Sequence, residues 1–215
     1  MLLNLEQLRK DYALSALELN DTAANPYEQF AAWMQSALKE KLPEPAAMTL
    51  ATVDANGQPN ARMVLLKGMK LNEGFIFYTN YRSQKGQELD ANPKAALVFY
   101  WEAMQRQIRI QGHVQKISRE DSTAYFQSRP KGSQIGAMAS PQSQVLQNRQ
   151  ELEKEVLRLN EKYKSLDKLP RPENWGGYIL IPDYFEFWQG RSSRLHDRIR
   201  YRLEEGKWER ERLAP

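Results

Sequence analysis

The stretch Met48 to Lys67, MTLATVDANGQPNARMVLLK, decides the fold class. Two strand-like runs, MTLATV and NARMVLLK, flank the turn formers Asp54-Ala55-Asn56-Gly57. Asn and Gly tolerate the backbone conformations that a tight turn requires, and the flanking runs have the composition of strands. The stretch therefore predicts a β-hairpin, and from Ala47 onward the apolar periodicity changes from helical to strand-like.

The rest of the chain extends this pattern in both directions. Helices are predicted at residues 4–17, 26–40, 118–127 and 151–163, with a polar loop through Ser143 between the last two. Further strands are predicted at residues 74–79, 94–101, 105–116, 178–181, 184–189, 198–202 and 207–212. Short strands without regular strand-helix alternation favour a mainly antiparallel β barrel with flanking helices over a doubly wound sheet. Side chains fill a barrel of this size, so we expect a binding site outside it or at an interface.

Length and composition indicate a single domain over residues 1–215, with an N-terminal helical segment over about residues 1–40. The chain has no cysteine, which excludes disulfides, thiolate zinc sites and a cysteine nucleophile and fits a cytoplasmic protein. Its two histidines exclude a metal site built from several imidazoles, so no metal is expected. The longest apolar run, Ala95 to Trp101, is too short to span a membrane. A net charge of +4 suits a phosphorylated ligand or, less well, nucleic acid.

Two segments carry groups that bind anions. The run Arg191 to Arg198, RSSRLHDR, places His196 among three arginines, whose guanidinium groups bind phosphates and carboxylates in a bidentate manner. The alternative interpretation of this run is a solvated basic turn. The run Tyr125 to Ser133, YFQSRPKGS, offers a phenol, a guanidinium and hydroxyls at a helix end, which is typical of a phosphate cradle and also of an ordinary helix terminus.

Arg62 and Lys67 bracket an apolar strand, and their odd-numbered offset places them on opposite faces. Trp188, just before the arginine cluster, is a candidate for covering a flat ring. His113 lies within a strand, where an exposed or hydrogen-bonded structural role is expected. No glycine-rich dinucleotide motif or phosphate-loop lysine motif is present, so the sequence gives no support to a Rossmann or nucleoside-triphosphate site.

These motifs, in this order, resemble the pyridoxine/pyridoxamine 5′-phosphate oxidase family along nearly the whole chain. The matching stretches are RMVLLK, FYTN, SQKG, FQSRPKGSQIGA, SPQSQV, NWGG, EFWQG, RLHDR and the terminal RLAP. The resemblance implies an FMN-binding split barrel that forms a homodimer, with two flavin sites at the subunit interface and C-terminal strands that complete them. It also implies a soluble, cytoplasmic enzyme that binds neither nucleic acid nor membrane.

The resemblance also implies residue roles. The residues expected to bind FMN are Arg62, Met63, Val64, Leu65, Leu66, Lys67, Tyr78, Thr79, Gln84, Lys85, Gln107, Gln142, Ser143, Trp188 and Arg198. The substrate phosphate would contact Lys67, Tyr125, Arg129 and Ser133, with Arg194 and His196 over the pyridine ring as the catalytic pair. Arg9 and Tyr12 would belong to an N-terminal lid over the substrate. Gln84 departs from the family pattern, because some members carry arginine there, and an amide replaces a charge-assisted bond to the flavin phosphate.

The implied reaction oxidises the exocyclic C4′ carbon of pyridoxine 5′-phosphate or pyridoxamine 5′-phosphate to give pyridoxal 5′-phosphate, with O2 as acceptor and H2O2 as product. The flavin supplies the difficult chemistry, and the protein supplies binding and orientation. Two alternatives remain at this point: a split-barrel flavoprotein with another substrate, and a basic barrel that binds nucleic acid or stores flavin without turnover.

Overall fold

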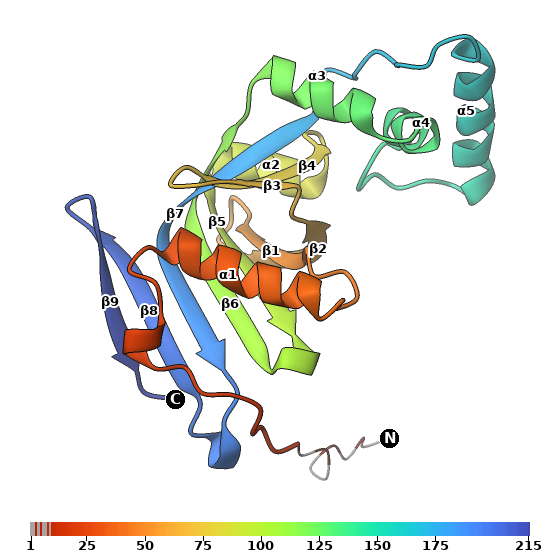
Figure 1. Cartoon of the computed structure of the whole chain (residues 1–215). Helices are drawn as coiled ribbons and strands as arrows, with labels where there is room; N and C mark the ends of the chain where they lie inside the picture. Colours follow the sequence, from red (N-terminus) through yellow and green to blue (C-terminus); the bar gives the residue numbers. More distant parts are fainter. Residues whose placement is uncertain (1–2, 4, 6–7, 9) are drawn as a thin grey trace. The chain divides into compact units, whose positions relative to one another are not determined.

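The computed structural model describes Leu3, Leu5, Leu8 and residues 10–215. Figure 1 shows the order of its α-helices and strands. In the text, η denotes one turn of 3-10 helix. The elements are η1 (Leu19–Asp21), α1 (Pro26–Lys39), β1 (Ala47–Val53), β2 (Pro59–Leu65), β3 (Gly68–Lys70), β4 (Gly74–Asn80), α2 (Gln84–Ala91), β5 (Lys94–Trp101), η2 (Glu102–Met104), β6 (Arg106–Lys116), α3 (Arg119–Ser128), α4 (Lys131–Ala139), α5 (Arg149–Lys162), β7 (Trp175–Gln189), η3 (Ser192–Arg194), β8 (Asp197–Glu204) and β9 (Lys207–Leu213). Within the described chain, no helix has both the length and the apolar character needed to cross a membrane.

The strands join one sheet in the order β2-β1-β5-β6-β7-β4-β3, with β8 paired to β7 and β9 paired to β8. The pairs β3–β4, β4–β7, β7–β8 and β8–β9 are antiparallel. The predicted runs 178–181 and 184–189 form one long strand, β7, which pairs with β4 through its first half and with β8 through its second. The predicted fold class, mainly antiparallel β with flanking helices, is confirmed.

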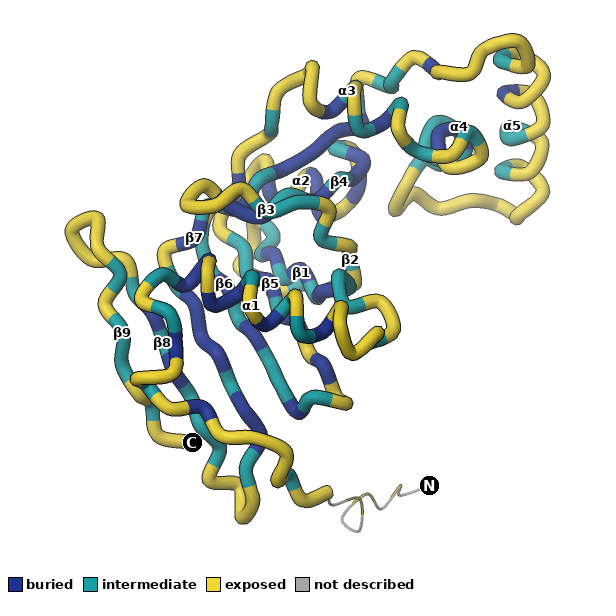
Figure 2. Tube along the Cα trace, in the orientation of Figure 1, coloured by how far each residue is buried: buried dark blue, intermediate teal, exposed yellow. Residues whose placement is uncertain are grey.

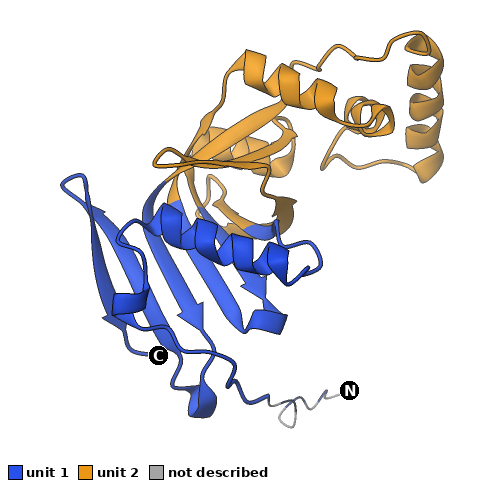
Figure 3. Cartoon of the chain, viewed as in Figure 1, with its two compact units in different colours: residues 1–49, 96–111, 182–215 blue, residues 50–95, 112–181 orange. Residues whose placement is uncertain are grey.

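The chain forms two compact units (Figure 3). Unit 1 comprises residues 1–49, 96–111 and 182–215, and unit 2 comprises residues 50–95 and 112–181. Strands β1, β5, β6 and β7 contribute residues to both units. The single domain expected over residues 1–215 stays a prediction.

In unit 1, helix α1 forms where the sequence predicts it. The Asn25 side chain caps its N-terminus by accepting a backbone N–H from the first turn, and proline is the first helical residue. The apolar side of the helix packs on the sheet: the rings of Phe30 and Phe99 lie 5.2 Å apart, and those of Trp33 and Phe187 lie 5.3 Å apart. Figure 2 shows the buried stretches of α1 and of the strands. Burial of these aromatic rings stabilises this unit.

The helix predicted over residues 4–17 is wrong for the part that the structure describes, none of which is helical. The backbone N–H of Leu14 donates to Gln105 Oε1 at 3.3 Å, and that of Leu17 donates to Asp197 Oδ2 at 3.0 Å. In a helix these N–H groups would bond to carbonyls four residues earlier. Side chains distant in sequence satisfy them instead, so the segment stays extended.

In unit 2, two helices form that the sequence analysis did not predict. Helix α2 is capped by the Ser83 side chain, which accepts the Gly86 N–H. Helix α4 forms in the first part of the region expected to be a polar loop through Ser143, so that expectation is wrong there. Its residues Ile135 and Ala139 are buried in a cluster with apolar residues of α3, α5 and β7, and this burial stabilises a helix of only nine residues.

Candidate functional site

A cavity of about 560 Å³, the cationic cavity, lies in unit 2. Its lining residues are Met63, Val64, Leu65, Lys67, Tyr78, Thr79, Asn80, Lys85, Tyr125, Arg129, Pro130, Ser133, Gly136, Ala137, Ser140, Gln142 and Trp175. They come from β2 and the loop after it, β4, the N-terminus of α2, the helices α3 and α4, the loops after these two helices, and the start of β7. Three of these side chains, Lys67, Lys85 and Arg129, are cationic, and none of the described lining residues is a carboxylate. The cavity therefore suits an anionic ligand such as a phosphate ester.

Arg129 is the C-cap residue of α3 and lines the cationic cavity. Its guanidinium carbon lies 4.8 Å from the centre of the Trp175 ring. Its Nη1 is buried and has no hydrogen-bond partner among the described residues. Burial lowers the pKa of Arg129 below its ordinary value. A buried guanidinium donor without a protein acceptor is a strong binding group for a ligand anion.

Two tyrosines stack in the wall. The ring centres of Tyr78 on β4 and Tyr125 on α3 lie 3.8 Å apart with an interplanar angle of 16°. Burial, and next the neighbouring Tyr125, raise the pKa of Tyr78 to about 12. Burial also raises the pKa of Tyr125, against the opposing effect of Arg129. Both phenols therefore stay protonated at neutral pH and can donate a hydrogen bond to a phosphate oxygen.

Lys85 is a second cationic group of the cavity and lies in the first turn of α2. Its side chain is buried, and its pKa is lowered by burial and then by Arg62, although Glu88 acts in the opposite direction. A helix N-terminus and an adjacent ammonium both favour a bound anion. Nearby in the lining, Thr79 Oγ1 donates to Gln142 Oε1 at 3.2 Å, which connects β4 to the loop after α4.

Arg62 and Gln84 do not line the cavity, and both bind the buried carboxylate of Glu88. Glu88 accepts hydrogen bonds from Arg62 Nη2 at 2.9 Å, from Gln84 Nε2 at 2.8 Å and from Asn60 Nδ2 at 2.8 Å, and a further one from Thr52. Burial acts to raise the pKa of Glu88, but these hydrogen bonds outweigh it and the net pKa is lowered. The network joins β1, β2 and α2 and so fixes the wall from which Lys85 extends.

A second cavity of about 500 Å³, the N-terminal pocket, lies in unit 1. Its lining residues are Leu8, Lys10, Asp11, Tyr12, Arg191, Ser193, Arg194 and His196. The ring of Tyr12 lies 5.9 Å from those of both Trp188 and His196, and the latter two rings are 4.6 Å apart. The expected lid residue Tyr12 therefore lies against the expected catalytic histidine.

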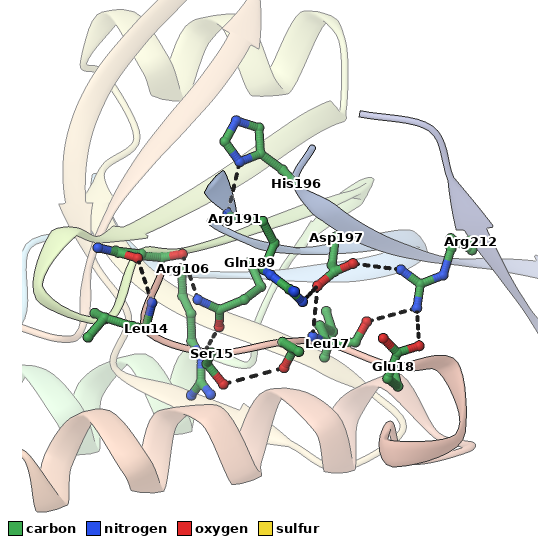
Figure 4. A network of polar contacts seen from close by, with 12 residues as sticks. Leu14, Ser15, Leu17, Glu18, Arg106, Gln189, Arg191, His196, Asp197 and Arg212 are labelled. Carbon is green, nitrogen blue, oxygen red and sulfur yellow. Dashed lines mark hydrogen bonds and ion pairs between the residues drawn. The ribbon is translucent and has the colours of Figure 1, made fainter. Parts of the chain in front are cut away.

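The orientation of His196 is set by the backbone (Figure 4). The Arg191 N–H donates to Nδ1 of His196 at 3.1 Å. Because Nδ1 accepts this hydrogen bond, the neutral imidazole carries its proton on Nε2. Nε2 is therefore the atom that can donate a hydrogen bond to a ligand.

Asp197 holds the loop around His196 in place (Figure 4). Its carboxylate binds Arg191 Nη1 and Arg212 Nη1, both at 2.8 Å, and the backbone N–H of Leu17 at 3.0 Å. Burial acts to raise the pKa of Asp197, but hydrogen bonds from Leu17, Arg191 and Arg212 lower it below its ordinary value. The N-terminal segment and the loop before β8 thus share one anchor.

Arg194 is exposed and has the left-handed backbone conformation, with φ of 60°, and Ser193 before it has φ of 54°. Two consecutive non-glycine residues in this region are uncommon and strained, and such strain is often found at functional sites. No ion pair of Arg194 occurs within the described chain. Its guanidinium is therefore available to a ligand.

The remaining candidates of unit 1 lie on β6, β7 and β8. Arg198 Nε and Arg109 Nη1 each bind the buried carboxylate of Glu186 at 2.9 Å. In the β7–β8 register, Trp188 lies opposite Arg198. Gln107 is half-buried on β6. Glu186 is thus the residue that fixes Arg198. This role was not predicted, because Trp188 was the only residue of the EFWQG stretch considered as a candidate.

The predicted site residues thus fall into three groups. Those lining the cationic cavity are Met63, Val64, Leu65, Lys67, Tyr78, Thr79, Lys85, Tyr125, Arg129, Ser133 and Gln142. Those lining the N-terminal pocket are Tyr12, Arg194 and His196. Those lining neither cavity are Arg62, Leu66, Gln84, Gln107, Ser143, Trp188 and Arg198, and Arg9 lies outside the described residues.

Several lining residues were not predicted from the sequence, among them Asn80, Trp175 and the α4 residue Gly136. Trp175 belongs to the matching stretch NWGG, to which no residue role was assigned from the sequence. His113 is exposed on β6, as predicted, near the Gln115 side chain. Among the described residues, no three His, Asp or Glu side chains are grouped closely enough to hold a metal ion.

Comparison with known families covers nearly all of the chain. Residues 34–163 match the family model described as pyridoxamine 5′-phosphate oxidase. The chain belongs to the pyridoxamine 5′-phosphate oxidase family. Residues 175–215 match a second model of this family, described as the pyridoxine 5′-phosphate oxidase C-terminal dimerisation region. The resemblance on which the sequence analysis relied is therefore confirmed.

Curated members of the pyridoxamine 5′-phosphate oxidase family match from end to end. A pyridoxine/pyridoxamine 5′-phosphate oxidase of Synechocystis sp. is 52% identical over 212 residues, covering 99% of this chain and 98% of that protein. One from Azotobacter vinelandii is 54% identical over 214 residues and covers 98% of both. Among solved structures, PhzG from Burkholderia lata 383, in complex with tetrahydrophenazine-1-carboxylic acid, has a TM-score of 0.88 and 29% identity, covering 96% of this chain and all of that one. These similarities agree with the split-barrel fold expected from the sequence.

Proposed function

We propose that this chain is an FMN-dependent oxidase that converts pyridoxine 5′-phosphate or pyridoxamine 5′-phosphate to pyridoxal 5′-phosphate. The observation that carries the proposal is the cationic cavity, with three cations, no carboxylate among its described lining residues and a buried Arg129 Nη1 without a partner. The proposal is also supported by relatives named pyridoxine/pyridoxamine 5′-phosphate oxidase, which are more than half identical over nearly the whole chain. O2 accepts the two electrons and becomes H2O2, and the amine substrate also consumes water and releases ammonia.

The residues present fit FMN as the cofactor. Its phosphate is an anion, for which Lys85 at the N-terminus of α2 is a suitable partner, and the exposed apolar edge of β2 at Met63 and Leu65 suits a flat ring. When bound, FMN would accept a hydride from C4′ and pass two electrons to O2. We expect Lys67, Thr79 and Gln142 to complete the set on this side.

The chain's own residues bind and orient the substrate in this proposal. Lys67, Tyr125, Arg129 and Ser133 hold the phosphate, far from the reacting carbon, so its binding energy serves orientation. His196 donates a hydrogen bond through Nε2 to the substrate ring, since its Nδ1 already accepts one from the backbone. Arg194 presents its charge to the reacting end of the substrate.

The proposal includes a homodimer in which two subunits build each site. It is supported by the C-terminal dimerisation region and by the separation of the expected residues into two pockets with no lining residue in common. One subunit would supply the cationic cavity, and the partner would supply the arginine loop together with Trp188, Arg198 and Gln107. A cytoplasmic location stays a prediction.

A different substrate is the second candidate, because PhzG was solved with a ligand that carries a carboxylate and no phosphate. The deciding experiment is anaerobic addition of pyridoxamine 5′-phosphate to the flavin-loaded protein while the visible flavin absorbance is followed. Bleaching that reverses in air, with pyridoxal 5′-phosphate formed, supports the proposal. A flavin that stays oxidised with both phosphorylated precursors would contradict it and favour the second candidate.

Replacing Arg129 with alanine is expected to raise the apparent KM for pyridoxamine 5′-phosphate about 30-fold with little change in kcat, since charge-assisted hydrogen bonds contribute about 1.5–3 kcal/mol. Steady-state kinetics measures both constants. The control is Lys131→Ala, a neighbouring cation that does not line the cavity and instead binds the Lys164 carbonyl. A loss confined to kcat would contradict the phosphate role.

A further inference from the structure

Arg129 has no carboxylate among its described contacts, although most half-buried arginines in this chain have one. Arg62 and Arg198, for example, bind buried glutamates. The positive charge of Arg129 instead faces the Trp175 ring at 4.8 Å and the Phe126 ring at 5.8 Å. A ring face attracts a cation without offering an acceptor oxygen, so it holds the guanidinium and leaves its N–H groups free.

Trp175 is well placed to hold other groups in position because both its backbone and its ring are fixed. It is the first residue of β7 and lies opposite Asn80 of β4 in the register. Its N–H donates to the Pro172 carbonyl, and its own carbonyl accepts from Arg171. The residue is only 6% exposed, and its ring centre lies 5.1 Å from that of Phe126 in an edge-to-face arrangement.

The same ring also positions the two tyrosines of the cavity wall. The ring of Tyr78 lies 5.5 Å from that of Trp175 at 11°, and Tyr125 lies 6.2 Å from it at 6°. Tyr78, Tyr125 and Arg129 therefore all pack on one rigid side chain. Two of the three, Tyr125 and Arg129, are the groups expected to bind the substrate phosphate.

We infer that Trp175 is a positioning residue for phosphate recognition: it presents Arg129 and Tyr125 to the phosphate of the substrate by holding the guanidinium through its ring face. The inference rests on the proposed function only for the identity of the phosphate ester. A carboxylate in this place would fix Arg129 equally well, but it would compete with the phosphate for the same N–H groups. The tryptophan avoids that competition.

The test uses Trp175→Leu, which removes the ring face, and Trp175→Phe, which keeps an aromatic ring with weaker attraction for a cation. Equilibrium dialysis of pyridoxine 5′-phosphate measures binding without turnover when it is done anaerobically on the flavin-loaded protein with its flavin reduced beforehand, since a reduced flavin cannot accept a hydride. We expect a loss of affinity of about 10-fold for leucine and about 3-fold for phenylalanine, in line with a partly desolvated cation–π contact. Binding of pyridoxine, which lacks the phosphate, should be the same in all three proteins.

A double-mutant cycle assigns the effect to Arg129. In an Arg129→Ala background, Trp175→Phe should lower affinity for pyridoxine 5′-phosphate by less than about 1.5-fold, because the group that the ring holds is gone. In kinetic assays of Trp175→Phe and Trp175→Leu, KM for pyridoxine 5′-phosphate should rise and kcat should stay within about twofold of the wild-type value. This is the pattern for losing an interaction that binds the substrate and the transition state equally. The matched control is Trp33→Phe in unit 1, where Arg106 lies 4.4 Å over the ring but the tryptophan lines neither cavity.

Unchanged affinity in Trp175→Phe and Trp175→Leu would overturn the inference. So would equal losses for pyridoxine and its phosphate, which indicate a merely structural role, or an undiminished effect in the Arg129→Ala background. Should Trp175→Leu fail to fold, the phenylalanine variant and its cycle decide alone. A wild-type protein that binds pyridoxine 5′-phosphate but does not oxidise it would contradict the proposed function and leave the dialysis test of Trp175 intact.

Discussion

Replacing Arg194 with alanine should lower kcat for pyridoxamine 5′-phosphate by about 100-fold, the usual cost of removing one charged or hydrogen-bonding group aimed at the reacting atoms. Arg194 lines the N-terminal pocket, is exposed and has no ion pair within the described residues, so no protein group competes for its charge. Stopped-flow measurement of flavin reduction isolates the chemical step. FMN affinity, measured by flavin fluorescence, should stay within about twofold because Arg194 is not among the expected flavin contacts.

Two further variants sharpen this test. Arg194→Lys keeps the charge and loses the planar fork, so it should recover only part of the rate. Arg200→Ala removes a β8 arginine that pairs with Glu211 and lines neither cavity, and its turnover should match the wild type. If Arg194→Ala turned over at the wild-type rate, Arg194 would have no catalytic role.

Replacing Glu88 with alanine should lower the free energy of unfolding by about 3–5 kcal/mol, the cost typical of breaking a buried ion pair. Glu88 is 5% exposed and is the common acceptor for Arg62, Gln84, Asn60 and Thr52. Its loss leaves the Arg62 guanidinium and three neutral donors without this acceptor. Urea unfolding followed by circular dichroism measures the change.

The control is Glu88→Gln, which keeps the size of the side chain and loses its charge, so it should cost less than the alanine variant. A loss below about 1 kcal/mol in Glu88→Ala would contradict the stabilising role of the network. FMN affinity of Glu88→Gln tests whether the network also positions Lys85, which lies in the same helix and interacts electrostatically with both Arg62 and Glu88.

The pH dependence of stability follows from the lowered pKa of Glu88. Burial alone would raise this pKa, but the hydrogen bonds from Thr52, Gln84 and Arg62 bring it below the ordinary value of 4.5. The stabilisation is therefore fully present above pH 4.5 and is lost as the pH falls through the lower value of the folded state. Urea unfolding between pH 6 and pH 3 should show a shallower loss of stability in Glu88→Gln than in the wild type. Parallel curves would contradict this.

Local patterns were sufficient for most of the secondary structure. The hairpin at Met48–Lys67 and the helix α1 form where predicted, because turn residues, a capping Asn25 and apolar periodicity all act within a few residues. The prediction failed where distant partners decide. Leu14 and Leu17 donate to Gln105 and Asp197 instead of forming a helix, and no pattern within residues 4–17 indicates this.

Helix α4 shows the opposite failure. Its short sequence, KGSQIGAMA, contains two glycines and favours a loop, and it becomes helical because Ile135 and Ala139 are buried against α3, α5 and β7. The formation of α4 also affects the candidate site, because this helix brings Ser133 and Gly136 into the lining of the cationic cavity. Tertiary burial therefore created part of the site that sequence pattern alone would leave unstructured.

By itself, the sequence determined the antiparallel fold class, the family and the types of side chain in the site. The reason is that the residue order within motifs and the periodicity of apolar residues are local properties of the chain. Only the tertiary structure decided which of those side chains share a cavity, as Lys67, Lys85 and Arg129 do. It also decided that Arg62 forms an ion pair with Glu88 and that the Arg129 guanidinium lies over the Trp175 ring. The physical reason is that charge compensation and ring contacts depend on which distant residues become neighbours, and the packing of the whole fold sets that.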